Sequence, residues 1–100
     1  MKIEERIERI KYLEKNYDEC LAKIKKLKAD VEDFKTIYPK IADLEKYYED
    51  GSFQEDYKLD EEGMIPQDLK RGILSEDAIY DLLMDFDQIK EIIKELNECL

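Results

Sequence analysis

Apolar residues recur at intervals of three and four residues along both ends of the chain, and this spacing constrains the fold more than any other feature. The N-terminal series comprises Leu13, Tyr17, Cys20, Ile24, Leu27, Val31 and Phe34. The C-terminal series comprises Ile79, Leu82, Phe86, Ile89, Ile93, Leu96 and Leu100. Because an α-helix turns once every ~3.6 residues, each series lies along one face of a helix and resembles the seam of a coiled coil.

The N-terminal spacing predicts a helix over residues 2–36, a stretch without Gly or Pro. Ile3, Ile7 and Ile10 continue the apolar face toward the N-terminus. The step from Ile10 to Leu13 is three residues where four are due, which is a stammer that overwinds the pairing locally. A helix of this length measures roughly 50 Å, so we expect an elongated molecule.

Pro39 predicts a turn or sharp kink over residues 36–38 and a separate short helix over residues 39–50, since an interior proline costs a helix ~3 kcal/mol. The alternative is one helix kinked at Pro39, because the apolar phase continues across it from Phe34 to Ile41. A clean break would let the last helix run parallel to the first. A continuous, kinked helix would make the two antiparallel.

The segment over residues 51–74 has no helical periodicity and holds all three glycines of the chain. Its apolar residues are Phe53, Tyr57, Leu59, Met64, Ile65, Leu69, Ile73 and Leu74. A solvated linker would not carry so many, so we expect an irregular clasp that packs across the helices. Pro66 and Gly72 predict a single helical turn over residues 66–71.

Ser75 marks the start of the last predicted helix, over residues 76–98, because its hydroxyl can accept a hydrogen bond from a free backbone N–H. Glu76 and Asp77 lie where the helix dipole favours negative charge. Together these elements predict an all-α fold, an elongated helical hairpin or three-helix bundle with coiled-coil-like packing. The length predicts a single domain over residues 1–100.

The chain carries 17 basic and 27 acidic residues, a net charge of −10. Ten basic and nine acidic residues lie in the first 36 positions, so the negative charge belongs to the remainder. Affinity for a phosphate backbone comes mainly from Lys and Arg, so we expect no direct binding to nucleic acid. Acidic character favours a basic partner or serves solubility. The lysines within residues 23–28 could form ion pairs with the acidic half of this chain or of a second copy.

Histidine is absent, which removes the commonest general base and a common metal ligand. The sequence contains neither a Ser–His–Asp or Cys–His arrangement nor a phosphate-binding glycine loop. A charged segment follows Met1, and no apolar stretch approaches the ~20 residues of a membrane span. We therefore expect a cytoplasmic protein with Cys20 and Cys99 as reduced thiols, and we predict neither enzymatic activity nor a cofactor.

Ten residues in and around the clasp form the candidate interaction surface. They are Tyr47, Tyr48, Phe53, Asp56, Tyr57, Asp60, Glu61, Lys70, Arg71 and Tyr80. Tyrosine is favoured at interfaces, although such a group more often closes a small core.

Two sets of charged residues in the clasp could bind a ligand. Lys70 and Arg71 could bind an anion beside a helix start or form ion pairs with nearby carboxylates. Those carboxylates are Asp68, Glu76 and Asp77. Asp56, Asp60 and Glu61 could form a loose Ca²⁺ or Mg²⁺ site, although their spacing does not fit an EF-hand.

The second half of the chain carries a distinctive series of residues. They are Tyr47-Tyr48, Asp56-Tyr57, Asp60-Glu61, Gly63, Pro66, the run LKRGILSED from Leu69 to Asp77, and Tyr80. This series resembles a bacterial family, the domain of unknown function 4298, whose members in low-GC Gram-positive and related bacteria have a variable helical start. Phe53 stands where those proteins usually have Trp, and Asp50 where Ser is usual. The family has no established activity, so the resemblance implies boundaries but no catalytic residue.

Three functional hypotheses follow. The first is a non-enzymatic protein–protein interaction module that binds a protein partner, or self-associates, through its helix faces. The second is an acidic inhibitor that mimics nucleic acid and occupies the groove of a basic partner, as small phage counter-defence proteins do. It requires the carboxylates of residues 43–87 to form one surface. The third is an anion- or metal-dependent ligand-binding protein or hydrolase that uses Lys70, Arg71 and the carboxylates of the clasp.

Overall fold

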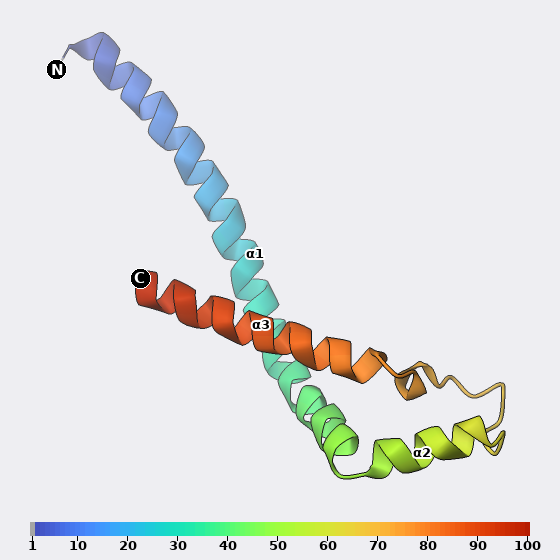
Figure 1. The fold of residues 1–100 in the computed structure, drawn as a ribbon. Coiled ribbons are helices and arrows are strands. Elements are labelled where there is room, and N and C mark those ends of the chain that lie inside the picture. Colours follow the sequence, from blue (N-terminus) through green and yellow to red (C-terminus); the bar gives the residue numbers. More distant parts are fainter. Residues whose placement is uncertain (1) are drawn as a thin grey trace. The chain divides into compact units, whose positions relative to one another are not determined.

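The computed structural model describes residues 2–100, and Met1 lies outside the described residues. The predicted all-α fold is confirmed, because the described residues form helices, turns and loops without any strand. The helices are α1 (Ile3–Glu49), α2 (Ser52–Glu61), the short 3-10 helix η1 (Gly72–Leu74) and α3 (Ala78–Cys99) (Figure 1). The chain divides into two compact units, Met1–Tyr38 and Pro39–Leu100, and each is described by itself.

The predicted break at Pro39 is wrong. α1 continues through Pro39 to Glu49, so the turn over residues 36–38 and the separate helix over residues 39–50 do not form. The physical reason is burial beyond the proline. Ile41 is only 7% exposed, and Leu44 packs against the core of the second unit. Burying one such side chain contributes roughly 1.5–3 kcal/mol, which offsets the ~3 kcal/mol that an interior proline costs.

The clasp is more helical than its sequence predicts. Residues 52–61, expected to be irregular, form α2. Two of the three glycines that suggest a loop lie just outside this helix. Both adopt left-handed backbone angles, with φ of 94° at Gly51 and 74° at Gly63. Asp50 Oδ1 accepts a hydrogen bond from the backbone N–H of Ser52 at 2.9 Å. Hydrogen bonds from the side chain and then from the backbone of Ser52 lower the pKa of Asp50. The glycines therefore mark the ends of a helix.

Of the predicted helical turn over residues 66–71, only a hydrogen-bonded turn over residues 66–69 forms. The backbone N–H of Leu69 bonds to the carbonyl of Pro66 at 3.2 Å, which makes an isolated turn, and the next helical residues are those of η1. Before α3, Ser75 Oγ accepts a hydrogen bond from the backbone N–H of Ala78 at 3.3 Å, as predicted, although the N-cap position is Asp77. α3 begins two residues later than predicted and ends at Cys99.

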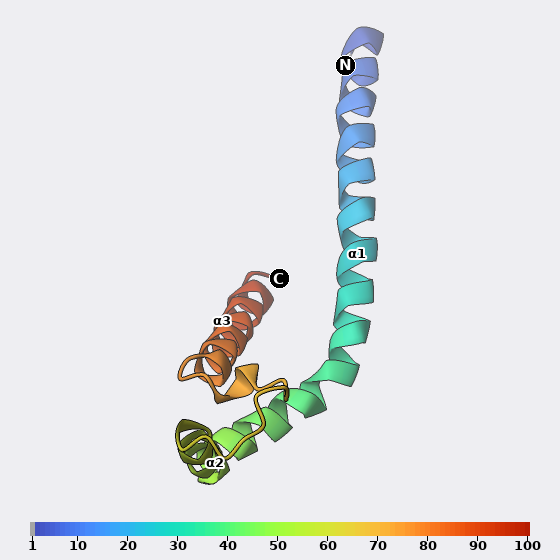
Figure 2. The same ribbon diagram turned by 90° about the vertical axis from the view of Figure 1, so that its right-hand side faces the viewer.

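The second unit has a small core. One buried side chain comes from each of α2, η1 and α3, namely Phe53, Leu74 and Ile79. The partly buried side chains packed against them are Leu44, Tyr47, Tyr48, Tyr57 and Leu83. The loop after α2 leads to η1 (Figure 2). Leu74 of η1 and Ile79 of α3 therefore pack in one cluster with Phe53 of α2.

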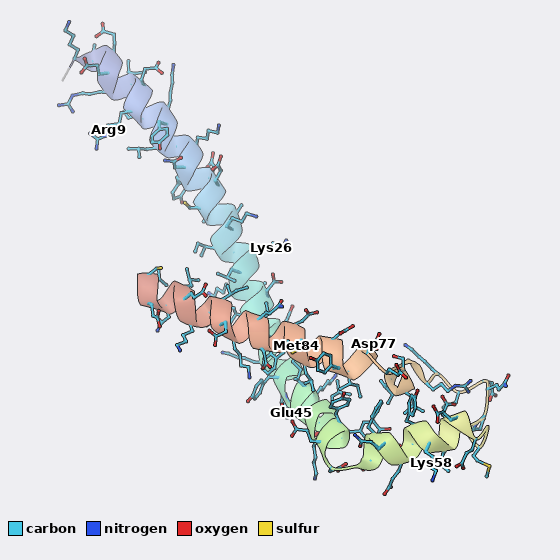
Figure 3. The ribbon with its side chains drawn as sticks, viewed as in Figure 1. Arg9, Lys26, Glu45, Lys58, Asp77 and Met84 are labelled. Atoms are coloured by element: carbon cyan, nitrogen blue, oxygen red, sulfur yellow. The ribbon has the colours of Figure 1, made fainter. Side chains whose placement is uncertain are left out.

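The first unit has no core among its described residues. Asn16 is half-buried, and every other residue from 2 to 38 is exposed. The exposed fractions of Ile24, Leu27 and Val31 are 61%, 53% and 51%. Side chains such as Arg9 and Lys26 project outward from the helix (Figure 3). The coiled-coil pairing that the spacing predicts stays a prediction.

Within residues 2–100, no helix combines the length and the apolar character that crossing a membrane requires.

Candidate functional site

Three tyrosine side chains gather around Phe53, and we call this group of four the aromatic cluster (Tyr47, Tyr48, Phe53, Tyr57). Ring centroids of Tyr48 and Tyr57 lie 5.1 and 5.9 Å from that of Phe53. Tyr47 meets the same ring edge-on, at 6.2 Å and 85°. Phe53 and Tyr57 share one face of α2 because they are four residues apart, and Tyr47 and Tyr48 close over it from the last turns of α1. The cluster joins α1 to α2.

Two tyrosine hydroxyls donate hydrogen bonds to carboxylates at the edge of this cluster. Tyr47 Oη donates to Asp56 Oδ2 at 2.7 Å, and Tyr57 Oη donates to Glu76 Oε1 at 3.0 Å. Burial, followed by the bond to Asp56, raises the pKa of Tyr47 to about 12. The bond to Glu76, followed by burial, raises the pKa of Tyr57 to about 12. Both phenols are therefore protonated at neutral pH and act as donors.

Arg71 serves an internal ion pair. Its Nε lies 3.1 Å from Asp60 Oδ1, and its Nη1 donates to the carbonyl of Pro66 at 2.9 Å. The expected carboxylate partners, Asp68, Glu76 and Asp77, are not the ones used. Arg71 instead ties the loop after α2 back to the last turn of that helix. Lys70 is exposed and makes no hydrogen bond or ion pair with residues 2–100.

A small cavity of about 210 Å³ adjoins these contacts. Its lining residues are Tyr47, Asp56, Ile65, Leu69, Lys70, Arg71, Ile73 and Leu74. The polar groups of Asp56 and Arg71 already bond to Tyr47 and Asp60. The cavity therefore offers mainly Lys70 and apolar side chains to a ligand.

No group of three or more His, Cys, Asp or Glu side chains within residues 2–100 lies close enough together to hold a metal ion. Two of the three carboxylates considered for a metal, Asp56 and Asp60, instead engage Tyr47 and Arg71.

A second hollow, of about 290 Å³, lies between the last turns of α1 and the first half of α3, and we call it the α1–α3 cleft. Its lining residues are Glu45, Tyr48, Glu49, Tyr80, Leu83, Met84, Phe86, Asp87 and Lys90. Figure 3 shows Glu45 and Met84 on the two helices that line it. Lys90 Nζ lies 3.0 Å from Asp87 Oδ1 and 4.7 Å from the centre of the Phe86 ring.

The structure thus brings together most residues of the candidate interaction surface, but they contact other residues of the second unit. The tyrosines pack on Phe53, Tyr47 bonds to Asp56, and Arg71 pairs with Asp60. Tyr80 lines the α1–α3 cleft together with Tyr48. Glu61 is exposed at the end of α2. Sequence reasoning missed Glu45, Glu49 and Asp87 as cleft residues. The spacing of Glu45 and Glu49, one helical turn apart, is the only local signal that could have paired them.

The fold and these contacts define a small all-α protein whose distinctive residues hold a helical unit together. The sequence model of the domain of unknown function DUF4298 matches residues 10–97. The chain belongs to this family, and the resemblance noted in its second half is confirmed. The searches of curated proteins and of solved structures returned no match.

Proposed function

We propose that this protein is a non-enzymatic protein–protein interaction module that binds a helical partner along α1. The binding surface is the α1 seam, which we define as Leu13, Tyr17, Cys20, Ile24, Leu27 and Val31. The observation that carries the proposal is the exposure of this seam. Its last three residues, Ile24, Leu27 and Val31, each keep more than half of their surface in water.

An uncovered seam is energetically costly. Leaving apolar surface in water forgoes about 25 cal/mol for each Å² that could be buried. The seam extends about 27 Å along the helix axis, and soluble monomers rarely expose contiguous apolar patches above roughly 300–600 Å². Most helices in proteins are also stabilised by packing of an apolar face rather than by propensity alone. A partner helix would supply both the burial and the packing.

The contacts of the second unit support a structural role for most of the signature residues. Tyr47, Asp56, Asp60 and Arg71 satisfy one another, so they hold the unit together. A catalytic role would leave such groups available to a substrate. The second unit therefore serves as a folded unit that follows the binding surface along the chain.

Photo-crosslinking tests this function. A benzoylphenylalanine at position 24 lies on the seam, whereas one at position 29 lies about 140° around the helix. We expect position 24 to crosslink to protein in the producing cell and position 29 to give much less product. Equal crosslinking from both positions would argue against the seam as the binding surface.

A second candidate function is the acidic mimic of nucleic acid, and one observation favours it. Only nine of the 27 acidic residues precede Pro39, whereas ten of the 17 basic residues do, so residues 39–100 carry a net charge of −11. A mimic would release its partner as salt rises from ~50 to ~200 mM, because electrostatic binding to phosphate-like surfaces is salt-dependent. It would also compete with nucleic acid for that partner. A captured partner that binds this chain and nucleic acid at the same time would exclude the mimic.

A further inference from the structure

We propose that the helix that covers the α1 seam is α1 of a second copy of this chain, in antiparallel orientation. This inference rests on the proposed function and names its partner. It is carried by two features of the exposed helix: the limits of its uninterrupted apolar spacing, and the signs of the charges beside it.

The uninterrupted spacing has defined limits. It begins at Leu13, after the stammer. Its last exposed member is Tyr38, because the next residue in phase, Ile41, is buried in the second unit. Reversing a second copy over this whole stretch sets Leu13 opposite Tyr38. The same register places Cys20 opposite Val31, and Ile24 opposite Leu27. Every apolar residue of one copy then meets an apolar residue of the other, which is what a coiled-coil core requires.

The charges beside the seam disfavour the parallel alternative. In a parallel pair, the residue just before one core position lies beside a residue five positions further along the other helix. Lys23 would then lie beside Lys28 of the other copy, and Arg6 beside Lys11. Like charges across a coiled-coil seam are destabilising. Asp30 beside Lys35 is an unlike pair that this arrangement provides.

Reversal replaces these conflicts with unlike neighbours. In the register above, Lys23 of one copy is level with position 28 of the other. Asp30 of that other copy is therefore only two residues, or about 3 Å along the axis, from Lys23. Glu14 and Lys35 are related in the same way. Each relation occurs twice because the pair is symmetric. Lys35 already forms an exposed contact with Glu32 of its own helix at 3.2 Å, and an exposed pair of that kind contributes little and exchanges readily.

Lys23→Glu separates the two orientations because it acts in opposite directions. In the antiparallel pair it sets Glu beside Asp30 twice, so we expect the dissociation constant of the dimer to rise about fivefold or more. In a parallel pair the new Glu would meet Lys28 and tighten the dimer. Adding Asp30→Lys to Lys23→Glu should restore the antiparallel dimer. Lys26→Glu makes the same change of net charge away from the seam and should leave the dissociation constant unchanged.

Native Cys20 gives an independent test of orientation in the full chain. With Cys99 replaced by Ser, a parallel in-register dimer brings the two Cys20 thiols together, and mild oxidation would crosslink them. The antiparallel dimer keeps them apart but brings Cys20 beside position 31. We expect Val31→Cys with Cys99→Ser to yield disulfide-linked dimers, and Cys99→Ser alone to yield none.

Sedimentation of the full chain across a range of concentrations measures the dimer, and circular dichroism confirms that each variant is folded. A dimer that survives Ile24→Asp, or one tightened by Lys23→Glu, would overturn the proposal. A chain that stays monomeric while position 24 crosslinks to a different protein would overturn it too, yet leave the proposed function standing. A monomer with no crosslinking from position 24 would remove both.

Discussion

The hydroxyl of Tyr47 links the last turns of α1 to Asp56 on α2, and that of Tyr57 links α2 to Glu76 just before α3. Each phenol is held against a carboxylate, so its ionisation would place two negative charges side by side. The folded second unit therefore depends on two phenols that keep their protons. The ionisation of these two phenols should therefore be visible in the pH dependence of the free energy of unfolding.

We expect the free energy of unfolding to fall as the pH rises above about 10. The pKa of Tyr47 and of Tyr57 is raised from 10.0 to about 12 in the folded chain, so the folded state binds these protons more tightly than the unfolded state. The stabilisation is complete below pH 10.0 and is lost as the pH approaches about 12. Urea denaturation over this range measures it. Tyr47→Phe should show a smaller loss, and an unfolding free energy independent of alkaline pH would contradict the expectation.

Phe53→Ala should destabilise the second unit by about 3–5 kcal/mol, because it removes the buried ring at the centre of the aromatic cluster. Thermal denaturation followed by near-ultraviolet circular dichroism reports on the surrounding tyrosines. Tyr12→Ala is the matched control, since Tyr12 is 66% exposed and should change stability by less than about 1 kcal/mol. Equal effects of the two changes would mean that the cluster is not the core.

At the scale of elements, α1 and α3 follow from the apolar spacing, because periodicity is a local property that the sequence displays directly. α2 was missed because its apolar face consists of little more than Phe53 and Tyr57, and because the glycines around it suggested a loop. The continuity of α1 through Pro39 depends on the burial of Ile41 and on the packing of Leu44 against a core that includes Leu74 and Ile79, far along the chain. The presence of both Glu45 and Asp87 in the lining of the α1–α3 cleft is equally non-local. Such effects cannot be read from neighbouring residues.

Gly51→Ala should cost about 1–2 kcal/mol of stability. Nothing lies within 4 Å of a Cβ placed there, so the cost comes only from the left-handed φ of 94° between α1 and α2. Gly72→Ala is the matched control, because it also has open space and lacks a left-handed backbone. Chemical denaturation of the two variants makes the comparison. A larger loss for Gly72→Ala would show that the α1–α2 turn does not need its backbone geometry.

At the scale of the whole molecule, the two units differ in where their stability comes from. Every residue of the core around Phe53 lies after Pro39, so the second unit supplies its own burial. The first unit has no buried residue among positions 2–38. Under the proposed pairing, the stability of the first unit follows mass action, because a partner stabilises it only at sufficient concentration.

Separating the units tests this difference. A fragment of residues 39–100 should fold alone, with Pro39 at a helix start that suits proline, and should retain the raised pKa of Tyr47 and Tyr57. A fragment of residues 1–38 should be largely unfolded when dilute and gain helix as its concentration rises. Circular dichroism across dilution measures both. Concentration-independent helix in the short fragment would contradict the assignment.

The absence of burial in residues 2–38 has a consequence for the order of events during synthesis. These residues leave the ribosome before residues 39–100, and domains generally fold in that order during synthesis. Here the earlier segment has no core of its own, whereas the later residues can fold at once on their own contacts. The molecule thus matures from its C-terminal part toward its N-terminus. Under the proposed pairing, chains synthesised on the same messenger RNA would be the first to pair through α1.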